Sequence, residues 1–109
     1  MRLALVLLFV AACGKHASRA QVEAACEHEI ELGFWSGFED SIKKGGHDAN
    51  DPELHAMAVK ALAEQQQSDG WKAQLKTCTD GSVDQMTPAQ YECIVAAKTV
   101  QAGIACATK

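Results

Sequence analysis

An apolar run near the amino terminus leads to a cysteine, and this pattern bears on the compartment in which the chain folds. Arg2 precedes eight apolar residues at 3–10, and two alanines then lead to Cys13. A basic start, an apolar middle and a small-residue end are typical of a secretory signal peptide. The run at 3–12 is ten residues long, whereas a transmembrane helix needs about 20. We therefore expect the chain to be exported and to fold in an oxidising compartment.

The last residues of this run, Val10-Ala11-Ala12-Cys13, resemble the lipobox of bacterial lipoprotein precursors. The resemblance implies cleavage before Cys13, diacylglycerol on the Cys13 sulfur and, usually, an acyl chain such as palmitate on the new amino group. Gly14 follows the cysteine, as in lipoproteins of the outer-membrane class. An ordinary secretory signal peptide with an incidental Cys13 is the alternative. The resemblance implies a lipid-anchored protein of the bacterial cell envelope, at the outer membrane and facing the periplasm or the cell surface.

Length and charge indicate one small acidic domain. We expect a signal peptide at 1–12, a lipidated amino terminus and tether at 13–18, and one domain at 19–109. The chain has 14 acidic and 10 basic residues, for a net charge of -4. Because no basic cluster accompanies this balance, we do not expect nucleic acid or anionic lipid head groups as ligands. The expected partners are the membrane, through the lipid on Cys13, and an unidentified envelope protein.

Four further cysteines indicate covalent cross-links. They are Cys26, Cys78, Cys93 and Cys106. An even number of cysteines in an exported chain predicts two disulfides, with three possible connectivities. A zinc site is the alternative, but 51, 14 and 12 residues separate successive cysteines, and structural zinc sites normally draw on closely spaced pairs. We therefore expect no metal and no other cofactor.

Helix signals dominate and strand alternation is absent, so we expect an all-α fold, a small bundle of three to four helices stapled by two disulfides. The first helix starts at Ser18, because Ser18 and Gln21 match a capping box. Apolar residues then recur every four positions and form one stripe. The stripe consists of Val22, Cys26, Ile30, Phe34, Phe38 and Ile42. Gly33 and Gly37 predict a bend or restart in its middle, and the sequence at 43–46 (two lysines, two glycines) predicts its end.

The middle of the chain predicts one helix or two. Asp51 and Pro52 match an N-cap and a first helical position. Either two helices follow, at about 52–67 and 69–78, or one helix continues through Gly70 at a cost of about 1 kcal/mol. The predicted inner face is Met57, Ala61, Trp71, Leu75 and Cys78, flanked by Leu54, Ala58 and Leu62. Residues 79–86 are expected to form a loop.

The last helical stretch decides how the cysteines can pair. It starts with a capping box at 87–90, and a straight helix over 88–107 would hold Cys93 and Cys106 roughly 20 Å apart. A disulfide needs Cα atoms within about 7 Å. We therefore expect a turn at Lys98-Thr99, which gathers all four sulfurs at one end of the bundle. Two pairings remain open: Cys26–Cys78 with Cys93–Cys106, which we favour, or Cys26–Cys106 with Cys78–Cys93.

No residue pattern indicates catalysis. His28 lacks the second histidine of an H-E-x-x-H zinc motif, because Leu32 occupies that position, and we expect it to be exposed on an acidic helix face. A looser candidate cation site consists of His47, Asp48, Asp51 and His55. Asp51 is better explained as a helix cap. The cysteines also lack the C-x-x-C spacing of thiol-redox enzymes. We therefore expect that the protein is not an enzyme and that it binds no small-molecule substrate.

An aromatic cluster at 34–38 is the remaining candidate for binding. Phe34 and Phe38 lie on the apolar stripe and are expected in the core, whereas Trp35 lies off the stripe and suits a partner surface or the membrane interface. The sequence thus predicts a membrane-anchored, non-catalytic envelope lipoprotein that acts as an interaction or structural module. Residues 87–106 also resemble the C-terminal, cysteine-containing helical ends of small lipoproteins of diderm bacteria, and this resemblance supplies no known activity to transfer to this chain. The alternative is a periplasmic metal-binding or thiol-redox protein that uses Cys26, His28 and the other cysteines.

Overall fold

Helices account for all the regular secondary structure in residues 16–48 and 50–109, the part of the chain that the computed structural model describes. They are α2 (Arg19–Lys44), α3 (Pro52–Gln66), α4 (Asp69–Ser82), α5 (Pro88–Ala96), α6 (Val100–Ala105) and a 3₁₀ turn, η1 (Cys106–Thr108). The predicted all-α fold stapled by two disulfides is confirmed. The predicted signal peptide, Cys13 and residues 14–15 lie outside the described residues. Within the described ranges, no helix has the length and hydrophobicity needed to cross a bilayer.

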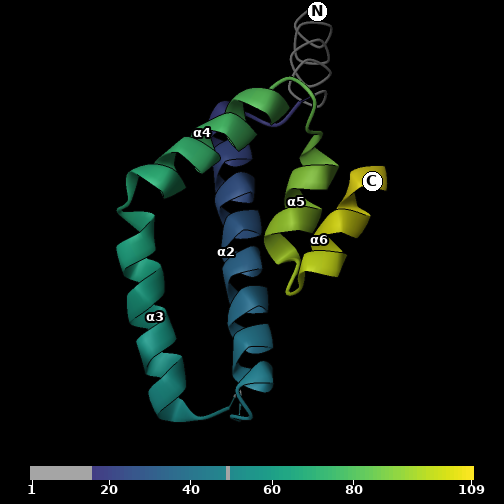
Figure 1. The fold of residues 1–109 in the computed structure, drawn as a ribbon. Helices are drawn as coiled ribbons and strands as arrows, with labels where there is room; N and C mark the ends of the chain where they lie inside the picture. Colours follow the sequence, from purple (N-terminus) through teal and green to yellow (C-terminus); the bar gives the residue numbers. More distant parts are fainter. Residues whose placement is uncertain (1–15, 49) are drawn as a thin grey trace, which may run out of the picture.

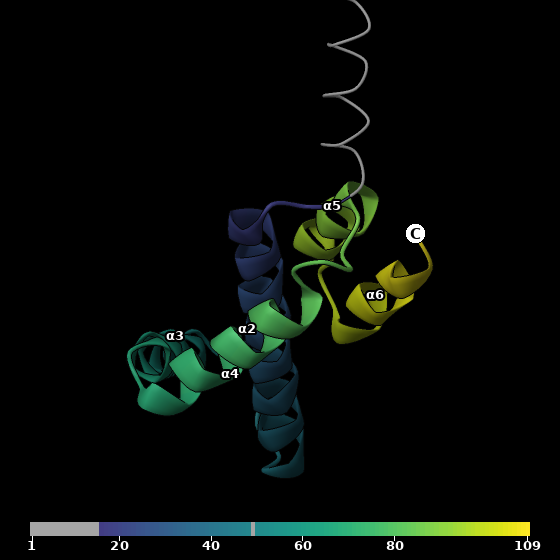
Figure 2. The same cartoon turned by 90° about the horizontal axis from the view of Figure 1, so that it is seen from above.

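The central element is α2, against which the other helices are arranged. Figure 1 shows α3 running back alongside it and α4 crossing it, and in both views α3 lies on one side of α2 and α5 and α6 on the other (Figures 1 and 2). The predicted capping box is present, because the Gln21 N–H donates to Ser18 Oγ over 3.2 Å and the Ser18 N–H donates to Gln21 Oε1 over 2.9 Å. The predicted end is also confirmed, with Gly46 at a φ of 75°.

The predicted bend in α2 is wrong, since α2 runs unbroken through Gly33 and Gly37. A Cβ atom built at either glycine would meet nothing within 4 Å, so no close approach of another backbone requires a glycine there. Each glycine costs a helix about 1 kcal/mol relative to alanine. Contacts of α2 with α3, α4, α5 and α6 outweigh this local cost and keep the helix continuous.

The 52–82 region forms two helices rather than one. Asp51 caps α3 as predicted, since its Oδ1 accepts from the Glu53 N–H over 2.9 Å, and Ser68 caps α4. The predicted inner face of α3 is wrong: Met57 is 66% exposed, whereas the flanking Leu62 is buried. The predicted inner face assumed that one helical face continues from residues before Ser68 to residues after it. Because α3 and α4 have different axes, the face of α4 that contains Trp71 does not continue into α3.

The predicted loop at 79–86 begins too early, because α4 continues to Ser82. Thr79 is 1% exposed, and its hydroxyl donates to the Leu75 carbonyl over 2.8 Å. The next residue, Asp80, pairs with Arg19 at the start of α2 over 2.7 Å. Tertiary contacts therefore extend the helix through residues whose local preference favours a turn.

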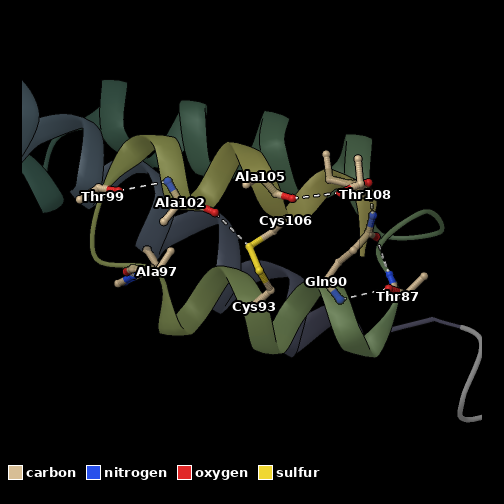
Figure 3. The surroundings of a disulfide bond; sticks show 11 residues. Thr87, Gln90, Cys93, Ala97, Thr99, Ala102, Ala105, Cys106 and Thr108 are labelled. Atoms are coloured by element: carbon tan, nitrogen blue, oxygen red, sulfur yellow. Dashed lines mark hydrogen bonds between the residues drawn. A yellow bond between two sulfur atoms is a disulfide. The ribbon is translucent and has the colours of Figure 1, made fainter.

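The end of the chain folds back on itself, as predicted. Ala97 leaves α5 in an extended conformation, with φ of -66° and ψ of 138°. The Thr99 hydroxyl then accepts from the Ala102 N–H over 3.1 Å and caps α6. Figure 3 shows α6 lying beside α5, with Cys106 facing Cys93.

The main core lies where the first turns of α2 meet α4, α5 and η1. It consists of Ala17, Val22, Ala25, Cys26, Met86, Ile94 and Cys106, with Leu75, Cys78, Tyr91 and Cys93 packed against it. Phe34 and Phe38 lie outside this cluster and are only half-buried. Their predicted place in the core is therefore wrong, because the second half of α2 is covered on fewer sides than the first.

Candidate functional site

Two disulfides join the elements that surround the core. Cys26–Cys78 connects α2 to α4 with Cα atoms 6.0 Å apart, and Cys93–Cys106 connects α5 to η1 with Cα atoms 5.7 Å apart. Both separations fit ordinary disulfide geometry. The favoured pairing is therefore the one that the structure contains.

A groove of about 440 Å³ opens beside the Cys26–Cys78 disulfide, and we call it the disulfide groove. It is lined by Cys26, Glu29, Ile30, Gly33, Phe34, Gln65, Trp71, Gln74 and Cys78. Residues of α2, α3 and α4 contribute, so the groove exists only because α4 crosses α2 next to α3. Sequence reasoning missed it for that reason.

Glu29 brings a carboxylate to the disulfide. One of its oxygens and the two sulfurs of Cys26 and Cys78 all lie within 4.8 Å of one another. Although much of the Glu29 side chain is exposed, the partial burial of its carboxyl group raises its pKa, and the nearby His28 partly opposes that shift. The i, i+3 spacing of Cys26 and Glu29 on one helix was a signal for this contact, but the third member comes from α4.

Trp71 has a polar atom that forms no hydrogen bond with any other described residue. Its side chain lines the disulfide groove, the residue is 6% exposed, and its indole Nε1 has no hydrogen-bond partner within residues 16–48 and 50–109. A buried donor without a partner is unfavourable. Among the described residues, the indole N–H of Trp71 is therefore a buried donor that stays unsatisfied.

Trp35, the predicted interaction residue, is half-buried between α2 and α3. Its ring stacks on His55 of α3, with centroids 5.2 Å apart and an interplanar angle of 16°. It also meets the edges of Phe34 and Phe38, at 5.2 and 5.7 Å. The aromatic cluster of α2 thus contacts α3 through the stacking of Trp35 on His55. The sequence did not indicate His55 as the residue that Trp35 contacts.

The predicted exposure of His28 is wrong. The residue is half-buried, and its Nε2 lies 2.6 Å from the carbonyl oxygen of Ala97 at the end of α5. The end of α5 packs against α2 and covers the face that contains His28, whereas the charge pattern of the sequence predicts that this face is exposed to solvent.

The residues of the looser candidate cation site around His47 are not brought together among the described residues. Among the described residues, the only group of three or more side chains placed to share a metal ion is Cys26, Glu29 and Cys78. Asp51 instead caps α3, and His55 stacks on Trp35. The chemistry-bearing residues therefore gather at the disulfide groove and not in the α2–α3 connection.

A second surface feature is the acidity of α2. Between Ala20 and Ile42 the sequence has six carboxylates and no lysine or arginine. The carboxylates belong to Glu23, Glu27, Glu29, Glu31, Glu39 and Asp40. Glu23, Glu39 and Asp40 are exposed, whereas Glu31 accepts a hydrogen bond from Gln66 Nε2 over 2.9 Å. Exposed carboxylates therefore lie near both ends of this stretch of α2, and Glu29, which is also exposed, lies between them.

Comparison of the chain with known protein families, with curated proteins and with solved structures finds no match.

Proposed function

We propose that the chain is a small lipoprotein of the bacterial envelope, anchored through Cys13, that acts without catalysis as an interaction module. Its acidic helix α2 binds a cationic segment of an envelope protein. The observation that carries this proposal is the run of six carboxylates on α2 between Ala20 and Ile42, a stretch that contains no lysine or arginine. Several negative charges on one helix attract a cationic partner and repel an acidic partner.

The amino-terminal sequence supports the anchor. Each buried methylene of an acyl chain contributes about 0.8 kcal/mol, so two or three chains hold a protein firmly at a membrane. Only residues 14–17 separate Cys13 from the Ser18 cap of α2, and four residues span at most about 14 Å when extended. The proposed anchor keeps the domain close to the bilayer surface.

The cross-links support export. Both disulfides join separate elements around the core, and such bonds persist in oxidising compartments rather than in the cytosol. A domain of this length buries a modest core, so the cross-links add needed stability.

Fatty-acid labelling tests the anchor. Cells that express the chain with labelled palmitate are expected to yield a labelled, membrane-bound product that lacks residues 1–12. The Cys13→Ser variant is expected to be unlabelled. A product in the cytosol that retains its amino-terminal methionine would contradict the proposed anchor.

Charge neutralisation tests the acidic surface. The variant Glu23→Gln/Glu39→Gln/Asp40→Asn removes three exposed charges from α2. The matched control Glu64→Gln/Asp84→Asn/Glu92→Gln removes three exposed charges from elsewhere in the domain. Both variants and the parent are used as acylated baits on detergent-extracted envelopes, over a range of salt concentrations.

Selective loss on the α2 variant is the expected result. We expect the parent bait to capture a partner protein at low salt and to release it at high salt. The control bait is expected to capture the same protein, and the α2 variant is not. Equal retention by all three baits would contradict the proposed use of α2.

A further inference from the structure

The group formed by Cys26, Glu29 and Cys78 has the composition of a metal site, and it has no part in the function proposed above. Its two sulfurs and one carboxylate oxygen lie within 4.8 Å of one another. In the described structure the sulfurs are bonded to each other. They are therefore unable to act as thiolate ligands until that bond is reduced.

The backbone already suits a tetrahedral ion. Two thiolates on zinc, each about 2.3 Å from the metal, lie about 3.8 Å apart. The Cα atoms of Cys26 and Cys78 are 6.0 Å apart, so rotation of the two side chains reaches that separation without moving α2 or α4. Glu29 lies one helical turn after Cys26 and supplies the third ligand from the same face of α2.

Access to the two sulfurs is unequal. Cys26 is fully buried, whereas Cys78 is half-buried. Both residues line the disulfide groove of about 440 Å³, so a small thiol or an ion reaches the bond at Cys78. The Cys93–Cys106 disulfide has no carboxylate or histidine placed to complete a metal site among the described residues.

We propose that reduction of Cys26–Cys78 by a small dithiol creates a zinc site formed by two thiolates and the Glu29 carboxylate. One thiol of the reductant attacks the Cys78 sulfur, the Cys26–Cys78 bond breaks, and a mixed disulfide forms. The second thiol then displaces Cys78, so the reductant leaves as a cyclic disulfide and the protein holds two thiols. Zn²⁺ replaces the two thiol protons, which pass to solvent.

The ligand set favours zinc over harder cations. Two sulfur ligands and one oxygen ligand are suited to a borderline ion, whereas Mg²⁺ and Ca²⁺ prefer oxygen alone. With three protein ligands, a fourth position is open toward the disulfide groove for water or a further ligand. The site thus binds zinc only under reducing conditions.

Zinc titration of the full chain in detergent tests the proposal. Oxidised and dithiol-reduced protein, the latter freed of reductant, are titrated with Zn²⁺ against a chromophoric chelator. The reduced protein is expected to bind one Zn²⁺ per chain at this site and the oxidised protein none. Glu29→Gln is expected to weaken binding by at least about tenfold, whereas Glu23→Gln, which removes the same charge outside the group, leaves the affinity unchanged.

The cysteine pairs provide a second comparison. Cys26→Ser/Cys78→Ser is expected to abolish the site, and Cys93→Ser/Cys106→Ser to retain it. Co²⁺ in place of Zn²⁺ is expected to show a thiolate charge-transfer band in the parent. Circular dichroism follows the helices throughout.

Three results would overturn the proposal. They are equal zinc affinity in Glu29→Gln and Glu23→Gln, tight zinc binding by the oxidised chain, and loss of the helical signal on reduction that Zn²⁺ fails to restore. The first of these also identifies binding by an unfolded thiol pair. None of the three bears on the acylation of Cys13 or on the acidic surface of α2.

Discussion

The side chain of His28 links the first half of α2 to the end of α5, since its Nε2 lies 2.6 Å from the carbonyl oxygen of Ala97. Ala97 is the residue at which the chain leaves α5 in an extended conformation, and it is 7% exposed. With a proton on Nε2, the imidazole donates to a carbonyl that no longer belongs to the helical ladder. The contact helps to fix the turn that returns Cys106 to Cys93.

Loss of the His28 side chain is therefore expected to destabilise the domain. His28→Ala leaves the Ala97 carbonyl buried without its donor, and we expect the free energy of unfolding to fall by about 1–2 kcal/mol. Urea denaturation of the oxidised protein measures it. His47→Ala, at an exposed position in the α2–α3 connection, is the matched control and is expected to change the value by less than about 0.5 kcal/mol. Equal effects of the two substitutions would show that the contact contributes nothing.

The two disulfides are expected to differ in their contribution to stability. Cys26–Cys78 closes a segment with a sequence separation of 52, and Cys93–Cys106 one with a separation of 13. Under the loop-entropy model, Cys26→Ala/Cys78→Ala is expected to cost about 4 kcal/mol and Cys93→Ala/Cys106→Ala about 3 kcal/mol.

Each pair has one fully buried and one half-buried cysteine, so the packing losses are similar and the two variants control for each other. Denaturant titrations give both free energies of unfolding. A larger loss from the Cys93–Cys106 pair would contradict the loop-length explanation.

The helix starts could be predicted from the sequence because their causes are local. Ser18, Asp51 and Thr87 each accept from a backbone N–H two or three residues ahead, and such contacts need no other part of the fold. The turn before Thr99 followed from a distance limit on Cys93 and Cys106. Short-range geometry, together with one covalent constraint, was sufficient for these features.

The predictions that were wrong concern features that depend on tertiary packing. The unbroken path of α2 through Gly33, the outward position of Met57 and the docking of His28 all follow from how neighbouring helices cover α2 and α3. The disulfide groove likewise needs the crossing of α4 over α2. Cys26 and Glu29 lie three positions apart in the sequence, but nothing in the sequence gives the angle at which Cys78 approaches them.

Removal of a helical glycine is expected to stabilise the protein. Gly37 lies within α2, and a Cβ atom there meets nothing within 4 Å. Gly37→Ala is therefore expected to raise the free energy of unfolding by about 0.5–1 kcal/mol, because glycine loses more backbone freedom on folding.

Gly46→Ala is the matched control, because Gly46 has a φ of 75°, which an alanine adopts only with strain. It is expected to lower the stability by about 1 kcal/mol. Thermal melts of the two variants measure both effects. A loss of stability in Gly37→Ala would show that the glycine is needed in α2 for a reason that its open surroundings do not reveal.

The carboxyl group of Glu29 is expected to make the stability of the oxidised protein depend on pH. Partial burial raises its pKa in the folded state, with His28 opposing the shift, so folding disfavours the charged carboxylate. Its contribution to stability is intact below the unfolded-state pKa and is lost as the pH rises through the folded-state pKa.

Glu29→Gln removes this dependence. The variant is expected to match the parent near pH 3 and to exceed it near neutral pH, by less than about 1 kcal/mol because solvent screens a partly exposed group. Denaturant titrations at both pH values measure the difference, and Glu23→Gln controls for the loss of one negative charge from α2. An advantage of Glu29→Gln that is the same at both pH values would assign the effect to packing rather than to ionisation.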